Sequence, residues 1–178
     1  DGTIAKVGEH PLPETFRELA AAGVMASAPE PFDPMEKAFH SLAAADLRTG
    51  ETLPGAGRTL GRSYALSPGL LAMSQAWATK GSGWQIAAKG APEAIIDLCR
   101  LDATACAVVS AQVNAMAAEG LRVLGVAEAA FADADLPDHQ RDFAFRFLGL
   151  VGLADPLRAS VPDAVKLCRS AGIRIIMI

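Results

Sequence analysis

The residues best suited to chemistry stand together in one short run, Lys89-Gly90-Ala91-Pro92-Glu93. Lys89 ends an apolar segment, and an ammonium at the exit of a strand can meet a phosphate or a nucleotide. Gly90 has no Cβ, so another group can approach the backbone closely there. Pro92 suits the first turn of a helix, where its missing N–H costs nothing. The run therefore predicts a strand, a tight turn and a helix, with a cation at the strand end.

A second polar group opens a helix in the run Asp33-Pro34-Met35-Glu36. Asp33 suits the N-cap position and Pro34 the first helical position. Glu36 then falls at the third position, where its carboxylate can return a hydrogen bond to the cap. The pattern predicts a helix over residues 34–45, with Glu36 as part of a capping box.

The remaining candidates for chemistry are dispersed. The histidines are His10, His40 and His139, and the cysteines are Cys99, Cys106 and Cys168. The histidines have no spacing typical of a metal site. The cysteines lack a Cys-x-x-Cys pair, which argues against a zinc site or a disulfide framework and favours a reducing compartment. The 16 basic and 20 acidic residues leave a net charge of −4 with no basic cluster, so no nucleic-acid partner is expected.

The elements that must position these groups follow from hydrophobic periodicity and turn residues. Near the N-terminus only a short strand around residues 3–7 is expected. Helices are predicted at 14–22, 34–45, 92–99 and 104–119, and strands at 62–66, 71–78, 84–89, 121–130 and 143–153. The links between the first three strands are too short for parallel crossovers, so these strands are expected to be antiparallel. Alternation predicts that Lys89 faces away from Trp84 and Ile86.

The pattern changes in the last part of the chain. A helix after Ser160 leads into the β-branched run 173–178, which suits a strand buried on both faces of a parallel sheet. We therefore expect an α+β domain over residues 1–152, an antiparallel sheet flanked by helices, and a short α/β piece over residues 153–178. Because the chain begins with Asp1 and stops inside an apolar run, we expect it to be a piece of a longer protein.

Four separated motifs stand in the order found in the nucleotide-binding domain of P-type ATPases, the phosphorylated cation pumps. They are Asp33-Pro34-Met35-Glu36, Lys89-Gly90-Ala91-Pro92-Glu93, Gly120-Leu121-Arg122-Val123-Leu124 and Gly152-Leu153-Ala154-Asp155-Pro156-Leu157-Arg158. The last motif runs on into Ala171-Gly172-Ile173-Arg174-Ile175-Ile176-Met177-Ile178. The set covers nearly all of residues 33–178. The chain thus resembles this domain, and most of all its calcium-pump branch.

The resemblance implies the ATP-binding cytosolic domain of a cation-transporting P-type ATPase, with calcium as the expected ion. Mg²⁺ would act with ATP in the parent protein, held mostly by residues outside this chain. The implied partners are ATP and the remaining phosphorylation, actuator and membrane domains of the same protein. The implied location is the cytoplasmic face of a membrane, with this piece itself soluble. Since the family's phosphorylated aspartate motif is not in this sequence, we expect no ATP turnover from this chain alone.

The resemblance also implies binding residues. Lys89 would lie beside the purine and the phosphate chain, over a pocket floor formed by Gly90 and Ala91. Arg122 would reach the phosphates. Glu36 would accept a hydrogen bond from the adenine amine, an alternative to its capping role that stays open at this point.

Two positions differ from calcium-pump relatives. Where those carry a phenylalanine that stacks on adenine and a second lysine, this chain has Leu66 and Leu71. Either Tyr64 substitutes as the aromatic platform or Leu66 makes a weaker apolar contact. ATP binding is therefore expected to be weak, at about sub-millimolar to millimolar concentration. Asp155 and Arg158 match the family's hinge between two domains, where a salt bridge or phosphate contact could help domain closure.

Two other functions remain open from the sequence. The chain could have kept the fold and lost the nucleotide, and act as a regulatory or interaction module, which the Leu66 and Leu71 differences allow. It could also be part of a haloacid-dehalogenase-type hydrolase, since that superfamily shares the C-terminal α/β piece.

Overall fold

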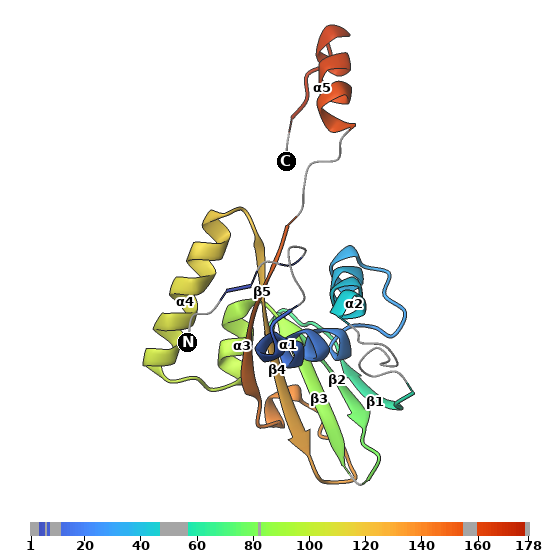
Figure 1. The fold of residues 1–178 in the computed structure, drawn as a ribbon, viewed down its shortest axis with the longest axis vertical. Coiled ribbons are helices and arrows are strands. Elements are labelled where there is room, and N and C mark those ends of the chain that lie inside the picture. Colours follow the sequence, from blue (N-terminus) through green and yellow to red (C-terminus); the bar gives the residue numbers. More distant parts are fainter. Residues whose placement is uncertain are drawn as a thin grey trace.

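The computed structural model describes residues 4–5, 7, 12–46, 57–81, 83–154 and 160–176. Its centre is a five-stranded sheet with the strands in sequence order (Figure 1). The strands are β1 (Leu60–Tyr64), β2 (Ala72–Ala78), β3 (Trp84–Gly90), β4 (Arg122–Phe131) and β5 (Arg146–Leu153). Every neighbouring pair is antiparallel, as the short links between the first three strands require. The predicted α+β fold, an antiparallel sheet flanked by helices, is confirmed.

One face of the sheet packs against α1 (Glu14–Met25) and α2 (Pro34–Asp46) (Figure 1). Alternation along β2 and β3 turns Trp77 and Ala87 to this face, where both are buried. The indole Nε1 of Trp77 donates to the carbonyl oxygen of Met25 at the end of α1, at 2.7 Å. This hydrogen bond ties the end of the helix to the sheet. We call this side of the sheet the α1–α2 face.

The opposite side, which we call the α3 face, packs against α3 (Pro92–Leu98). Ile86 of β3 and Ile95 of α3 are completely buried there. Phe143 lies in the same core, surrounded edge to face by other rings. These are Tyr64, Phe131 and Phe145, with ring centroids at 5.5, 5.3 and 5.8 Å. The helix α4 (Ala103–Ala118) follows α3 and leads back into β4.

Two boundaries differ from the predictions because of packing. The helix α1 continues through Gly23 to Met25, three residues past its predicted end at residue 22. A Cβ at Gly23 would lie 2.3 Å from Cδ1 of Phe39, so this glycine allows close contact between α1 and α2. The strand β5 begins at Arg146, after the predicted start at Phe143, because the Phe143 ring enters the core of the α3 face before pairing begins.

The C-terminal part differs most from expectation. The helix α5 (Val161–Ser170) forms as predicted, has no buried residue, and stands apart from the sheet in Figure 1. Ser160 precedes it, but its side chain makes no capping hydrogen bond. The described residues 173–176 form no strand, and their three isoleucines are exposed. The predicted strand is wrong over these residues, because a strand needs a partner to satisfy its backbone and none pairs with them in the described structure.

Some predicted features fall outside the described residues. The expected hinge residues Asp155 and Arg158 are among them. So is part of the short strand expected near residues 3–7, whose described residues 4, 5 and 7 are not in a strand. The division of the chain at residue 152 stays a prediction. Among the described helices, none is long and apolar enough to cross a membrane.

Candidate functional site

Lys89, near the end of β3, is a buried cation. Strand alternation turns it to the α1–α2 face, with Met73 of β2 and Val126 of β4 opposite it on either side. Only 6% of its side chain is exposed. Lysine is almost never buried to this degree without a partner. The groups around its ammonium therefore decide what this residue can do.

Three groups surround the Nζ atom of Lys89, and all come from α2 or the segment before it. Nζ donates to Glu36 Oε1 at 2.8 Å and to Ser27 Oγ at 2.6 Å. The Phe39 ring centroid lies 5.4 Å away, a cation–π contact. Ser27 in turn donates to the carbonyl oxygen of Gly23 at 2.8 Å. We call the group formed by Lys89, Glu36, Ser27 and Phe39 the lysine site.

The position of Glu36 corrects one prediction. Asp33 caps α2 as expected, since its Oδ1 accepts from Met35 N at 2.8 Å. In the described structure Glu36 returns no hydrogen bond to that cap. Its Oε1 instead accepts from Lys89 and, at 3.3 Å, from Ala28 N. The side chain is only 13% exposed, and a carboxylate this buried is stabilised more by a cation than by a single cap hydrogen bond.

Burial lowers the pKa of Lys89 below its ordinary value of 10.5, while the hydrogen bond and charge of Glu36, and then the charge of Asp33, act to raise it. The lysine site thus balances the desolvation of an ammonium against an ion pair. An ammonium held in this way can exchange its carboxylate partner for a phosphate or another acceptor that enters the site.

Gly90 and Ala91, the predicted pocket floor, are fitted closely to β2. A Cβ at Gly90 would lie 2.4 Å from the Leu71 carbonyl oxygen and 2.6 Å from Cα of Ala72. Ala91 N donates to the same Leu71 oxygen at 2.9 Å. The group that approaches Gly90 closely is thus the neighbouring strand. Pro92 then starts α3, as its position after the turn predicts.

The other predicted binding residues lie further away. Arg122 opens β4 and is exposed. It stands four residues before Val126, the neighbour of Lys89, which is ~13 Å along the strand. Leu66 and Leu71 are also exposed, at 57% and 52%. The structure therefore brings Glu36 to Lys89 and leaves Arg122, Leu66 and Leu71 exposed.

Tyr64 is not the aromatic platform that the sequence allowed. Its side chain belongs to the core of the α3 face, where its ring meets Phe143 edge to face. Its hydroxyl donates to the Pro137 carbonyl oxygen at 2.7 Å. Lys89 is on the other side of the sheet, so the alternative in which Tyr64 substitutes for the missing phenylalanine is wrong.

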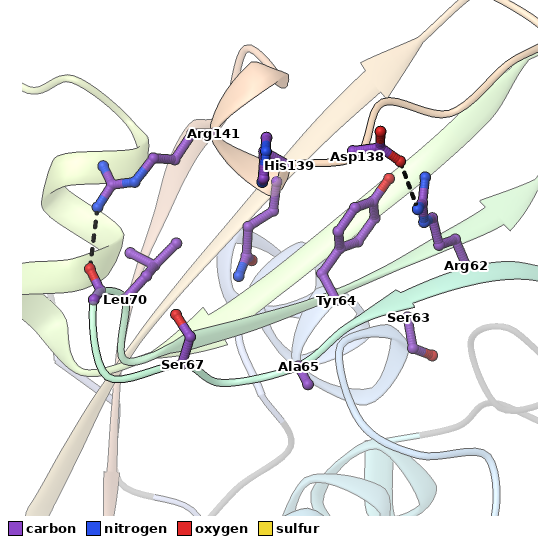
Figure 2. A pocket seen from close by; sticks show the side chains of 11 residues that line it. Arg62, Ser63, Tyr64, Ala65, Ser67, Leu70, Asp138, His139 and Arg141 are labelled. Carbon is purple, nitrogen blue, oxygen red and sulfur yellow. Dashed lines mark hydrogen bonds and ion pairs between the residues drawn. The ribbon is translucent and has the colours of Figure 1, made fainter.

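A hollow of about 490 Å³ lies next to Tyr64 (Figure 2). Two arginines line it, and both already have protein partners. Arg62 is paired with Asp138, and Arg141 donates to a backbone carbonyl. The hollow and the lysine site are on opposite faces of the sheet. We place the candidate site at Lys89, because its ammonium is desolvated and Glu36 of a second motif meets it there, whereas none of Glu36, Lys89 and Arg122 lines the hollow.

Sequence reasoning missed two residues that support the lysine site. Ser27 carries no motif, and the spacing of the chain gives no signal for it. His40 was assigned no role by its spacing, yet it is half-buried and its Nε2 lies 3.1 Å from the Ala28 carbonyl oxygen. Glu36 and His40 therefore contact the backbone nitrogen and the backbone carbonyl oxygen of Ala28. Across the described residues, no group of three or more His, Cys, Asp and Glu side chains could hold a metal ion.

Residues 72–160, which contain the strands β2 to β5, match the family model described as "P-type ATPase, cytoplasmic domain N". These residues include Lys89 and the turn that follows it. The chain belongs to this family. The antiparallel sheet found above agrees with that assignment.

Curated relatives agree on the family and differ in the ion. The chain is 33% identical over 130 residues to the sodium/potassium exporting P-type ATPase cta3 of Schizosaccharomyces pombe, covering 67% of this chain and 12% of the relative. It is 36% identical over 121 residues to sodium/potassium-transporting ATPase subunit alpha-A of Artemia franciscana, covering 54% of this chain and 12% of the relative. It is 34% identical over 113 residues to plasma membrane calcium-transporting ATPase 4 of Bos taurus, covering 55% of this chain and 9% of the relative. The matched part thus spans about a tenth of each relative's length, and these names do not single out the calcium-pump branch.

Proposed function

We propose that this chain is the ATP-binding domain of a cation-transporting P-type ATPase, and that its nucleotide binds at the lysine site. One observation carries the proposal. Lys89 and Glu36, which the motifs assign to one nucleotide pocket, stand 53 positions apart in sequence and meet at 2.8 Å. Family membership supports ATP as the ligand.

The burial of the lysine site dictates how a nucleotide would enter. Since the Lys89 side chain is only 6% exposed, the segment of Ser27 and Ala28 or the start of α2 must move before a ligand can contact Nζ. The ammonium would then exchange Glu36 for a phosphate or purine acceptor, and Glu36 would exchange the ammonium for the adenine amine. Each new contact replaces an existing one, so the net free energy of binding is small. This supports weak binding, at about sub-millimolar to millimolar ATP.

The parent protein would couple ATP hydrolysis to cation transport, with calcium as the expected ion. Residues 1–152 would form the nucleotide-binding domain, and residues 153–178, with Asp155 and Arg158, the hinge and the start of the returning phosphorylation domain. In the parent, Mg²⁺ would neutralise charge on the phosphates, bound mostly outside this chain. The domain would face the cytoplasm and work with the phosphorylation, actuator and membrane domains of the same protein. Gly90 and Ala91 would form the pocket floor, Leu66 would give an apolar contact, and Arg122 would reach the phosphates after the site opens.

Calorimetric titration of ATP into wild type, Lys89→Met and Lys80→Met tests the proposal. Methionine keeps most of the lysine's volume and removes the charge, and Lys80 is an exposed lysine in the β2–β3 turn that serves as the control. We expect wild type and Lys80→Met to bind ATP equally, and Lys89→Met to bind at least about tenfold more weakly. Circular dichroism melting confirms that each variant is folded at the titration temperature. Equal ATP affinity in folded Lys89→Met and wild type refutes the proposed site.

A second candidate function is a nucleotide-independent interaction module of the same fold. Two observations favour it: the Lys89 ammonium is already partnered by Glu36 and Ser27, and the exposed Leu66 and Leu71 offer no aromatic stacking. The same titration separates the two functions. No heat from wild type at several millimolar ATP, with no NMR shift changes at Lys89 or Glu36, favours the interaction module.

A further inference from the structure

The segment that joins α1 to α2 runs beside the lysine site and is held by few contacts. Ser27, just after α1, is buried, whereas the residues that follow it are half-buried or exposed. Two of them, Pro29 and Pro31, have no N–H to donate. In the part of the chain that the structure describes, residues 29–32 make no hydrogen bond. We call residues 28–32 the linking segment.

Two side chains of α2 hold the linking segment by its first residue, Ala28. Glu36 Oε1 accepts from Ala28 N at 3.3 Å, and His40 Nε2 lies 3.1 Å from Ala28 O. A carbonyl oxygen only accepts, so His40 Nε2 carries the proton and donates it. Further along, the 91% exposed Phe32 ring lies 5.6 Å from the ammonium of Lys37 at the surface, where such a contact is weak. Ala28 is therefore the point at which the segment is fastened to α2.

The fastening of Ala28 shares an atom with the ion pair of the lysine site. Glu36 and His40 are four residues apart on α2, so both side chains reach the same residue. The Oε1 atom of Glu36 that accepts from Ala28 also accepts from Lys89. With Ala28 in place, only 13% of the Glu36 side chain and 6% of the Lys89 side chain are exposed. A ligand that needs either group must therefore wait until Ala28 leaves.

The two ends of the linking segment are fixed independently of Ala28. Before it, Ser27 N donates to Val24 O at 2.9 Å and Ser27 Oγ donates to Gly23 O at 2.8 Å. After it, Asp33 caps α2. A short loop between two fixed ends can swing outward by rotation at a few backbone angles. Loss of the two hydrogen bonds of Ala28 thus lets the segment open while α1 and α2 keep their places.

We propose that residues 28–32 form a lid over the lysine site, and that His40 is the positioning residue that keeps this lid closed. The inference rests on the proposed function, since it describes how ATP reaches Glu36 and Lys89. The His40 N–H stabilises only the closed lid, because its acceptor on Ala28 moves away when the lid opens. The apparent affinity for ATP is reduced in proportion to the fraction of molecules that are open. Removal of the His40 hydrogen bond therefore strengthens ATP binding, although it removes a native contact.

Calorimetric titration of ATP into wild type, His40→Ala, His40→Gln and His139→Ala tests the inference. We expect His40→Ala to bind ATP about two- to tenfold more tightly than wild type, the factor that one net hydrogen bond contributes to closing. Glutamine carries an N–H the same number of bonds from Cα as His40 Nε2, so His40→Gln should restore the wild-type affinity. His139 is exposed in the hollow on the opposite face of the sheet, and His139→Ala should bind as wild type does.

Circular dichroism melting establishes that each variant is folded at the titration temperature. If His40→Ala is not folded there, His40→Asn takes its place, because the asparagine amide is one bond too short to reach Ala28 O in the same way.

Amide hydrogen exchange without nucleotide gives a second readout. The reference is Ala88, which is completely buried in β3 between two paired strands, so that its amide exchanges only when the sheet opens. In wild type we expect the Ala28 amide to exchange at least about tenfold faster than the Ala88 amide, through opening of the lid alone. In His40→Ala the Ala28 amide should exchange faster again, by about two- to tenfold.

The outcomes separate the lid from the site that it covers. Equal or weaker ATP binding by folded His40→Ala than by wild type, or exchange at Ala28 no faster than at Ala88, overturns the inference and leaves the proposed function standing. Tighter binding by His40→Ala that His40→Gln does not reverse also overturns the role of His40. Absence of ATP binding to both wild type and His40→Ala at several millimolar overturns the proposed function and the inference together.

Discussion

The substitution Glu36→Gln tests whether Lys89 is held as a buried cation by its carboxylate. The change keeps the shape of the side chain and removes the negative charge 2.8 Å from Nζ. Ser27 and Phe39 would still contact the amine but carry no countercharge. We expect Glu36→Gln to destabilise the protein strongly at pH 7, because it leaves a buried ammonium uncompensated.

The size of this loss has an upper limit, because the amine can lose its proton. Leaving a buried charge unpaired costs about 3–5 kcal/mol. Removing the proton at pH 7 from a lysine of ordinary pKa 10.5 costs about 5 kcal/mol, at about 1.36 kcal/mol per pH unit. At pH 9 the same step costs about 2 kcal/mol. We therefore expect a loss of about 3–5 kcal/mol at pH 7 that falls to about 2 kcal/mol or less at pH 9.

The pH dependence has a definite sign. Burial lowers the pKa of Lys89 in the folded protein, so the unfolded chain binds more protons than the folded chain between that lowered pKa and 10.5. The contribution of Lys89 to stability therefore rises with pH in that window. In Glu36→Gln the window begins at lower pH, because the two raising effects of Glu36 on the pKa are gone. The variant should approach wild type as the pH rises.

Urea unfolding followed by tryptophan fluorescence, at pH 7 and pH 9, measures both effects. Glu18→Gln is the matched control, since Glu18 pairs with the exposed Arg146 and is expected to lose less than about 1 kcal/mol at either pH. If Glu36→Gln is too unstable at pH 7, the double variant with Lys89→Met should recover stability, because methionine removes the buried charge that Glu36→Gln leaves unpaired. A loss in Glu36→Gln as small as in Glu18→Gln, and independent of pH, refutes the reasoning.

Three further predictions follow from the packing, two for substitutions and one for the alkylation of a cysteine. Gly90→Ala places a Cβ 2.4 Å from the Leu71 carbonyl oxygen, and should lower the free energy of unfolding by about 1–3 kcal/mol in urea titration; an unchanged midpoint contradicts the close approach. Tyr64→Phe removes the hydroxyl that donates to Pro137 O and keeps the ring, so a loss of about 1 kcal/mol is expected, and a loss above 3 kcal/mol contradicts this. Burial raises the pKa of Cys99 from 9.0 to about 11, so its alkylation by iodoacetamide at pH 8, followed by mass spectrometry, should be far slower in the native protein than in urea.

Periodicity predicted the sheet well because its signals are local. Alternating side chains and short links defined β2 and β3 to within one residue, and the short links allowed only antiparallel pairing. Boundaries failed where a distant contact decided them. The first helix was predicted to end at residue 22, yet α1 continues through Gly23, which lets Phe39 approach the helix. Phe143 was assigned to a strand, yet its ring enters the core before the strand begins.

The sequence by itself determined the strand, turn and helix around Lys89, the antiparallel order of the sheet and, through the order of its motifs, the family. The first two depend on residues close together in the chain, which local geometry constrains strongly, and the family follows from four motifs spread along it. Only the tertiary structure decided that Glu36 pairs with Lys89 rather than with its own helix cap, and that Ser27 accepts a hydrogen bond from the same ammonium. Such contacts join segments tens of residues apart, and their free energy depends on burial, which no local pattern contains.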